Sequence, residues 1–256
     1  MASTVINGHE KAAEPEEQWT RVHHKGRRRP KAPHSVAPSY IAGGIAGSVR
    51  SSSLSVPAIM EEHKRIKYQW ETSICYHKLQ EIFESRMSPS NISDAICFGT
   101  GSFDPEDSSW EMKRKAHIQL AAFLFIVKQL QRNSSRTIRC IFQEPVFNTS
   151  DKDFIRALGH EVVDSPIGFE LVSPTTLVFG IHLYRDVYAQ IIGKCLPAVF
   201  IGTPQEVWEE CYGSDPLDWV ELDELNKRCD KVKFPEDTGY TTFSSTTIHR
   251  RRCDET

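Results

Sequence analysis

From residue 57 onward, apolar residues are arranged along the chain in two different patterns. In the longer segments apolar residues recur every three or four positions, which gathers them on one side of a helix. The shorter segments are nearly continuous apolar runs, which are typical of strands buried on both faces. The predicted helices are 58–86, 108–133, 151–158, 183–193, one that begins at Pro204, and 217–228. The predicted strands are 92–98, 137–143, 160–164, 175–180 and 197–202.

The order of these segments predicts the fold. Strands that alternate with helices pair in parallel through right-handed crossovers, so that helices cover both faces of the sheet. We therefore expect an α/β protein, a three-layer Rossmann-like sandwich with a mostly parallel sheet. Residues 1–56 are too polar and too rich in small residues to form a core, so we expect a disordered basic arm there. The α/β domain is expected over 57–240 and a C-terminal tail over 241–256.

The composition excludes several classes of protein. With 39% apolar and 25% charged residues, the 256-residue chain suits one globular domain with some disordered sequence attached. No apolar run approaches the roughly 20 residues that span a bilayer, so we expect no membrane partner and a cytoplasmic or nuclear location. The seven cysteines form no C-x-x-C pair, and the His249–Cys253 spacing lacks companion ligands, so no metal site is expected.

A net charge of −3 provides no overall basic field that would hold nucleic acid. The local exception is the basic run of the arm, from Lys25 to Lys31, with three consecutive arginines at 27–29. This run is either a solvated stretch or a patch for nuclear import or RNA contact. An adaptor that acts through the arm is therefore one functional alternative, and nucleic acid is expected to bind nowhere else.

A glycine turn follows the first predicted strand, in the stretch "ICFGTGSFDPED". In an open parallel sheet, ligands bind beyond the carboxyl ends of the strands, where a glycine lets the backbone approach them closely. The candidate ligand-binding residues are therefore Gly99, Thr100, Gly101 and Ser102. The dinucleotide fingerprint is incomplete because Asp104 occupies its third glycine position, and no Gly-Lys-Ser/Thr follows. The turn either binds a nucleotide-like molecule or S-adenosylmethionine, or is a tight structural turn.

Two further side chains are predicted to reach the same edge of the sheet. Glu144 follows the second strand, where an acid can accept hydrogen bonds from ribose hydroxyl groups. Alternatively, Glu144 and Pro145 simply end that strand. His182 follows the strand 175–180, where it could act as a general acid or base, or bond local backbone groups.

Five sequence blocks occur in a fixed order: "ICFGTGSF", "HIQLAAFLFIVKQL", "FQEPVFNTSDKDFIRALGHEV", "LVFGIHLYRDVYAQII" and "FSSTTIHRR". Together they resemble the "sensitivity to red light reduced" (SRR-like) domain family of eukaryotes over about residues 60 to 250. The segment "WTRVHHKGRRRPK" is similar to the tryptophan and basic run that often precede that domain. The chain departs from the family pattern at Glu144, which replaces an aspartate, at Gly180-Ile181, which replaces Met-Pro, and at Leu183, which replaces a cysteine.

The resemblance implies roles in regulation, namely circadian and light signalling in plants and haem biosynthesis or cytoskeletal links elsewhere. No settled reaction comes with the family, and the sequence holds no complete catalytic constellation. Our first hypothesis is a regulatory protein that binds protein partners or a nucleotide-like small molecule. The alternatives are a group-transfer enzyme that uses S-adenosylmethionine or a nucleotide, with His182 as its catalytic residue, and the adaptor described above. The identity of any cofactor is left open.

Overall fold

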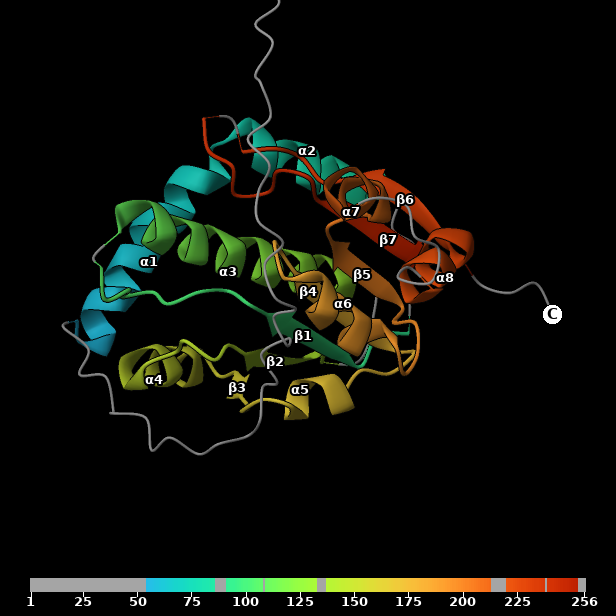
Figure 1. Cartoon of the computed structure of the whole chain (residues 1–256). Coiled ribbons are helices and arrows are strands. Elements are labelled where there is room, and N and C mark those ends of the chain that lie inside the picture. The colour runs from blue at the N-terminus through green and yellow to red at the C-terminus, as the bar shows by residue number, and fades with distance from the viewer. Residues whose placement is uncertain are drawn as a thin grey trace, which may run out of the picture. The chain divides into compact units, whose positions relative to one another are not determined.

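The structure is a computed structural model of the chain (Figure 1), and it describes residues 54–85, 91–107, 109–132, 137–212, 220–237 and 239–252. The predicted disordered arm therefore lies outside the described residues, except for its last three positions. The domain boundary at 56 remains a prediction.

The helices and strands follow one another in the expected order along most of the chain. The helices are α1 (Val56–Glu71), α2 (Ile74–Ser85), α3 (Trp110–Gln131), α4 (Thr149–Ala157), α5 (Ile167–Glu170), α6 (Arg185–Ile192), α7 (Gln205–Tyr212) and α8 (Val220–Arg228). The strands are β1 (Asp94–Phe98), β2 (Arg139–Gln143), β3 (Glu161–Val162), β4 (Thr176–Gly180), β5 (Val199–Gly202), β6 (Cys229–Lys233) and β7 (Thr247–Arg251).

All these strands form one sheet in the order β3-β2-β1-β4-β5-β7-β6. Strands β1 to β5 run parallel, whereas β7 is antiparallel to its neighbours β5 and β6. The chain proceeds from β1 outward to β3 on one side and then returns to place β4 on the other side of β1. The strand order therefore reverses between β1 and β4, which is the position where ligands bind in sheets of this kind. We refer to the edge where β1 to β5 end as the carboxyl edge.

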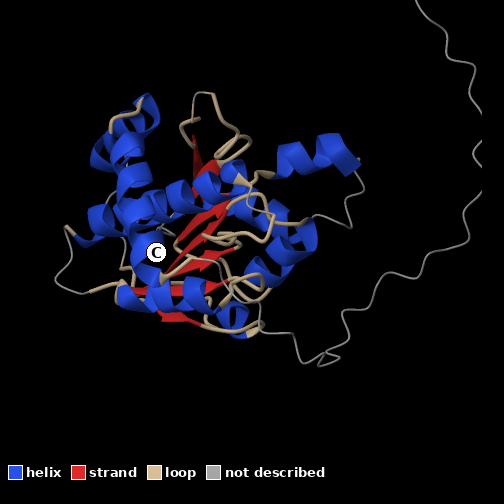
Figure 2. Ribbon diagram, turned by 90° about the vertical axis from the view of Figure 1, so that its left-hand side faces the viewer, coloured by secondary structure: helices blue, strands red, loops and turns tan. Residues whose placement is uncertain are grey.

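Two hydrophobic cores cover the two faces of the sheet. Along β1, Ala95 and Cys97 belong to a core with α1 to α4, whereas Ile96 and Phe98 belong to a second core with α5, α6 and α8. Figure 2 shows the strands between helices on both sides. The alternation of side chains along a strand explains why such a run must be apolar at every position. The predicted three-layer, Rossmann-like α/β fold with a mostly parallel sheet is confirmed.

The structure corrects three details of the predicted elements. The helix predicted over 58–86 is two helices, because Thr72 bonds the carbonyl of Gln69 and Ser73 caps the next helix through the amide of Tyr76. Helix α4 begins at Thr149, two residues before the predicted start at 151, because Asn148 caps it.

The third correction concerns the end of the chain. The segment predicted as a C-terminal tail, 241–256, supplies β7, which lies inside the sheet between β5 and β6. Neither β6 nor β7 was predicted, because "CDKVK" and "TIHRR" hold few apolar residues and several charged ones, in no regular alternation.

Candidate functional site

The candidate site is built on the connection between β1 and α3. Gly99 and Gly101 both have positive φ angles, of 68° and 80°, which side chains with a Cβ atom rarely adopt. A Cβ atom at position 99 would also lie 2.1 Å from Cδ2 of Leu183, which follows β4. Gly99 is therefore needed for two reasons: its backbone angle, and the space that the Leu183 side chain occupies against it. This contact joins the loops on both sides of the point where the strand order reverses.

Glu144 holds the second glycine of the turn. Its Oε2 accepts a hydrogen bond of 2.7 Å from the amide of Gly101, and its Oε1 accepts one of 3.1 Å from the amide of Val146. Burial raises the pKa of the Glu144 carboxyl, an effect that these two amides oppose and the nearby Asp151 reinforces. The structure thus brings the predicted residues Gly101 and Glu144 together, although 43 residues separate them along the chain.

Asp151 is a residue of this site that the sequence analysis missed. Its side chain is fully buried and accepts hydrogen bonds from the Ser102 hydroxyl (2.7 Å), the Phe103 amide (3.0 Å) and the Asn148 amide (3.1 Å). Asn148 accepts in turn from the Asp151 amide, which completes a capping box at the start of α4. The signal in the sequence was the run Asn-Thr-Ser-Asp at 148–151, in which a capping residue is followed three positions later by an acidic residue, as in a capping box.

The other two predicted residues of the turn have structural partners. The buried Thr100 hydroxyl lies 3.2 Å from the sulfur of Cys97. The Ser102 hydroxyl donates to Asp151 and accepts from the amide of Asp104 at 3.0 Å. Most polar groups of the turn are therefore already bonded within the protein, and carboxylates supply much of that bonding.

His182 lies at the same edge, in the connection from β4 to α6. Its φ angle is 54°, and its Nε2 lies 2.8 Å from the carbonyl oxygen of Ser244. A carbonyl can only accept, so Nε2 carries the proton, and in the neutral ring Nδ1 is left as an acceptor. Within the described ranges this Nδ1 has no hydrogen-bond partner. Ser245, next to the carbonyl that holds His182, is the other non-glycine residue with a positive φ angle in these ranges.

This arrangement favours some ligands over others. An added phosphate at the turn would lie beside the carboxylates of Glu144 and Asp151, and the Gly101 amide is already bonded. A hydroxyl group can instead donate to a carboxylate oxygen, because each oxygen accepts more than one hydrogen bond. The site therefore suits a ligand with hydroxyl groups and no negative charge at the turn.

No cluster of three or more metal-ligating side chains occurs among the residues that the structure describes. None of the helices in these ranges is both long and apolar enough to cross a membrane.

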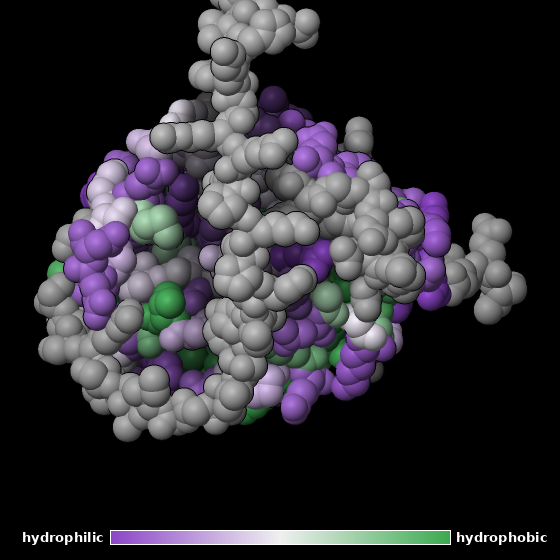
Figure 3. Space-filling view, viewed as in Figure 1, coloured by the Kyte–Doolittle hydropathy of each residue, from purple (hydrophilic) through white to green (hydrophobic). Residues whose placement is uncertain are grey.

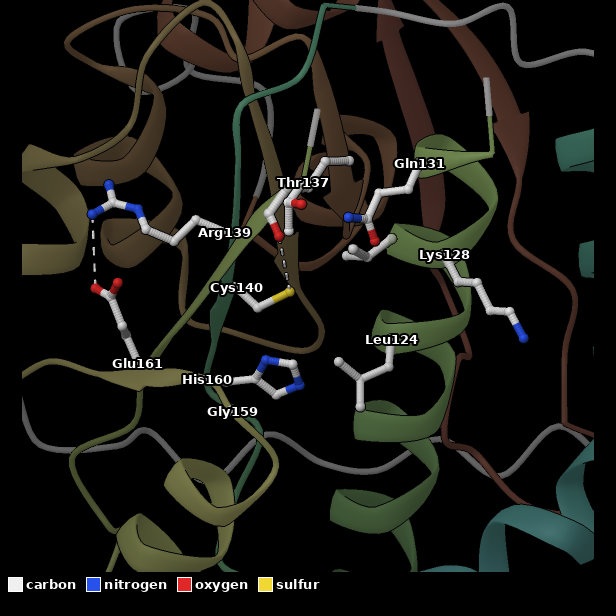
Figure 4. A pocket seen from close by; sticks show the side chains of 11 residues that line it. Leu124, Lys128, Gln131, Thr137, Arg139, Cys140, Gly159, His160 and Glu161 are labelled. Atoms are coloured by element: carbon white, nitrogen blue, oxygen red, sulfur yellow. Dashed lines mark hydrogen bonds and ion pairs between the residues drawn. The ribbon is translucent and has the colours of Figure 1, made fainter. Parts of the chain in front are cut away.

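A cavity of about 640 Å³ lies near the opposite edge of the sheet, where β2 and β3 begin (Figure 4). Burial raises the pKa of the Cys140 thiol in its wall to about 12 and lowers the pKa of His160. Arg139 is engaged with Asp94 at 2.7 Å and with Glu161 at 3.7 Å. The thiol is therefore unreactive, and this cavity has no group that marks it as a reaction centre.

Comparison with known proteins places these observations in a family. The family model described as the SRR1 domain matches residues 79–250, which is more than half of the chain. Among solved structures, a chain described as a class I S-adenosylmethionine-dependent methyltransferase from Listeria monocytogenes is similar, with a TM-score of 0.41 and 11% sequence identity. That alignment covers 80% of this chain and 71% of the other. A search of curated proteins found no match.

Proposed function

The chain belongs to the SRR1 domain family, and from this membership we propose that it is a regulatory protein that binds a small, hydroxyl-bearing ligand at the carboxyl edge. The ligand class that fits is a nucleoside or a nucleoside-like molecule such as S-adenosylmethionine. Regulation of circadian rhythm or of haem biosynthesis, and a location in the cytoplasm or nucleus, are parts of this proposal that derive from the resemblance alone.

The observation that supports the proposal is the meeting of three loops at one place. Glu144 after β2 bonds Gly101 after β1, and Leu183 after β4 lies against Gly99. These loops flank the position where the strand order reverses. An acid that follows the second strand can bind the hydroxyl groups of a ribose. In this structure the acid is already held in place by two backbone amides, so a ligand that donates to it meets a fixed acceptor.

Isothermal titration calorimetry with adenosine, S-adenosylmethionine and ATP tests this function. We expect adenosine or S-adenosylmethionine to bind and ATP to bind at least tenfold more weakly, because its phosphates would approach the two carboxylates. Glu144→Gln should weaken binding of the nucleoside at least tenfold, since the replacement loses one acceptor oxygen and the charge. Absence of binding by all three compounds would refute the proposed ligand class.

A matched pair of glycine variants shows whether the loss is local. Gly101→Val introduces a side chain at a φ angle of 80°. Gly239→Val introduces the same side chain at 88°, in the connection between β6 and β7, where an added Cβ atom meets nothing within 4 Å. Both variants carry similar backbone strain, so both should lose comparable thermal stability. Only Gly101→Val should lose ligand binding. Equal loss of binding in the two variants would mean that general destabilisation, rather than the turn, explains the effect.

The second candidate is a group-transfer enzyme that uses S-adenosylmethionine, and the observation that favours it is the orientation of His182. The Ser244 carbonyl holds its Nε2–H, which leaves the Nδ1 lone pair available to accept a proton from a substrate hydroxyl or amine. The test is release of S-adenosylhomocysteine in the presence of candidate acceptors. His182→Asn should abolish turnover and leave the affinity for S-adenosylmethionine unchanged. Binding without any turnover would favour the regulatory protein instead.

A further inference from the structure

On the face of the molecule that Figure 3 shows, hydrophobic side chains are visible in several separate places between hydrophilic ones. Apolar groups scattered in this way are ordinary at a protein surface and mark no binding site by themselves. The cavity of about 640 Å³ where β2 and β3 begin is different, because apolar and polar side chains there enclose one space. We refer to it as the amino-edge cavity. Its volume lies within the range of about 300–1,000 Å³ that is common for small-molecule sites.

Helix α3 and strand β2 supply the apolar walls of the amino-edge cavity. The helix contributes positions 124, 127, 128 and 131, a spacing that places them on one side of a helix. Positions 138 and 140 point to the same face of the sheet, because side chains alternate along an extended segment. The apolar residues of the lining are Leu124, Val127, Ile138 and Cys140.

The turn between α4 and β3 brings an imidazole ring into this cavity. Gly159 has a φ angle of 86°, and its amide donates to the carbonyl of Arg156. The next amide, that of His160, donates to the carbonyl of Ile155. This pair of bonds is a Schellman motif, which ends a helix and turns the chain at a glycine. Figure 4 shows the His160 ring on the opposite side of the cavity from Leu124.

Three polar side chains of the lining are available to a ligand. They are the His160 imidazole, the Gln131 amide and the Thr137 hydroxyl, and within the described residues none of them has a hydrogen-bond partner. Burial lowers the pKa of His160, so its ring is neutral at pH 7. Each of the three groups then carries both a donor and an acceptor.

The charged side chains of the lining are directed elsewhere. Arg139 is engaged with Asp94 and with Glu161 at the rim of the cavity. In Figure 4 the Lys128 side chain extends away from the cavity. The interior therefore presents neutral groups, which favour a neutral ligand because a charged one would lose its hydration without gaining a counter-ion.

We propose that the amino-edge cavity binds a small, neutral, planar molecule that carries both a hydrogen-bond donor and an acceptor, such as an aromatic amide. Its ring lies between His160 and Leu124, since a flat ring can stack on the imidazole while its other face meets an apolar side chain. Its amide faces the Gln131 amide, which can donate to the ligand's oxygen and accept from its nitrogen. This site is separate from the carboxyl edge and does not depend on the function proposed for it.

Nicotinamide is a suitable probe, because it is planar, neutral at pH 7 and carries an amide. The full chain is labelled with ¹³C-histidine, and the resonance of the His160 Cε1–H group, identified by its loss in His160→Phe, is followed during titration. We expect nicotinamide to shift this resonance in a saturable way. Nicotinate, which has the same ring with an anionic carboxylate, should bind at least tenfold more weakly. Absence of a saturable shift with nicotinamide, or binding of nicotinate that is equal or tighter, would overturn the proposal.

A matched pair of glutamine variants locates the bound molecule. Gln131 lines the amino-edge cavity, whereas Gln129, two residues earlier on α3, lines a different cavity. Gln131→Ala should weaken nicotinamide binding about tenfold, because the ligand's amide loses its partner, and Gln129→Ala should leave it unchanged. Equal effects of the two variants, or loss of binding in Glu144→Gln instead, would place the molecule elsewhere and overturn the proposal. Whether nucleosides bind at the carboxyl edge does not affect this result.

Discussion

Replacement of Asp151 is the sharpest test of how the glycine turn is held. The carboxylate is fully buried and accepts three hydrogen bonds, and two of the donors belong to the turn itself. Asp151→Ala leaves these donors without a partner. The Phe103 amide is buried and cannot turn toward water, whereas the Ser102 hydroxyl can rotate to another acceptor. The main cost therefore comes from the buried amide and from the lost helix cap.

The magnitude follows from these groups. An unsatisfied buried donor costs about 1–3 kcal/mol, and loss of a capping interaction costs about 1 kcal/mol. Part of this cost is offset, because burial raises the pKa of Asp151 and the ionised carboxyl is itself expensive to bury. We therefore expect Asp151→Ala to lower the free energy of unfolding by about 3 kcal/mol. Asp151→Asn keeps one acceptor oxygen and should lose about half as much.

Urea denaturation followed by circular dichroism measures this difference. The control is Asp153→Ala, two residues further along α4, where an exposed carboxylate pairs with Arg156 at 3.2 Å. An exposed pair of this kind contributes less than about 0.5 kcal/mol. We expect the free energies of unfolding of the two alanine variants to differ by more than about 2 kcal/mol. A difference of less than about 1 kcal/mol, with equal denaturant slopes, would refute the reasoning.

Three further predictions follow from the same structure. Gly99→Ala should cost about 2–3 kcal/mol in urea denaturation, because of its φ angle and the Leu183 contact, and Leu183→Ala should recover about 1 kcal/mol of that loss in the double variant. Burial raises the pKa of Glu144, so the native state holds that proton more tightly than the unfolded chain does. The stability advantage of the wild type over Glu144→Gln should therefore grow as the pH falls from 7 toward the ordinary value of 4.5, and a constant difference would contradict this. His63 and His117 lie 3.3 Å apart through their Nδ1 atoms, and burial lowers their pKa values to about 4 and about 3. The unfolded chain then binds protons first as the pH falls below 6.5, so the wild type should lose about 3 kcal/mol per ring by pH 4, and the double variant His63→Leu, His117→Leu should lose none of this.

The parallel part of the fold was predictable because its signals are local. The strand 175–180 carries the consecutive apolar residues Leu177, Val178 and Phe179, since both faces of the sheet are covered. The long helix 110–131 is rich in apolar residues over much of its length. The antiparallel pair was not predictable in the same way. β7 carries His249 and two arginines, and its Ile248 and His249 are buried where β5 and β6 pair with it on either side.

The candidate site was predictable in part. Gly101 and Glu144 could be proposed because each follows a strand, and the carboxyl ends of parallel strands share one edge. The local run could indicate Asp151 as part of a helix cap but not as a support of the turn, because its partners Ser102 and Phe103 lie 49 and 48 residues away. Likewise, Leu183 does not show in the sequence as a residue that lies against Gly99.

In the parallel part of the fold, the local residue pattern was enough to predict the main helices and strands, and hence that a glycine turn, an acid and a histidine follow strands at one edge. Those features depend on helical spacing and on continuous apolar runs, which each segment carries within itself. The packing of the folded chain establishes that the acid bonds the turn and that a second acid supports it. Such contacts depend on how segments some 50 residues apart pack together, and no local period encodes that distance.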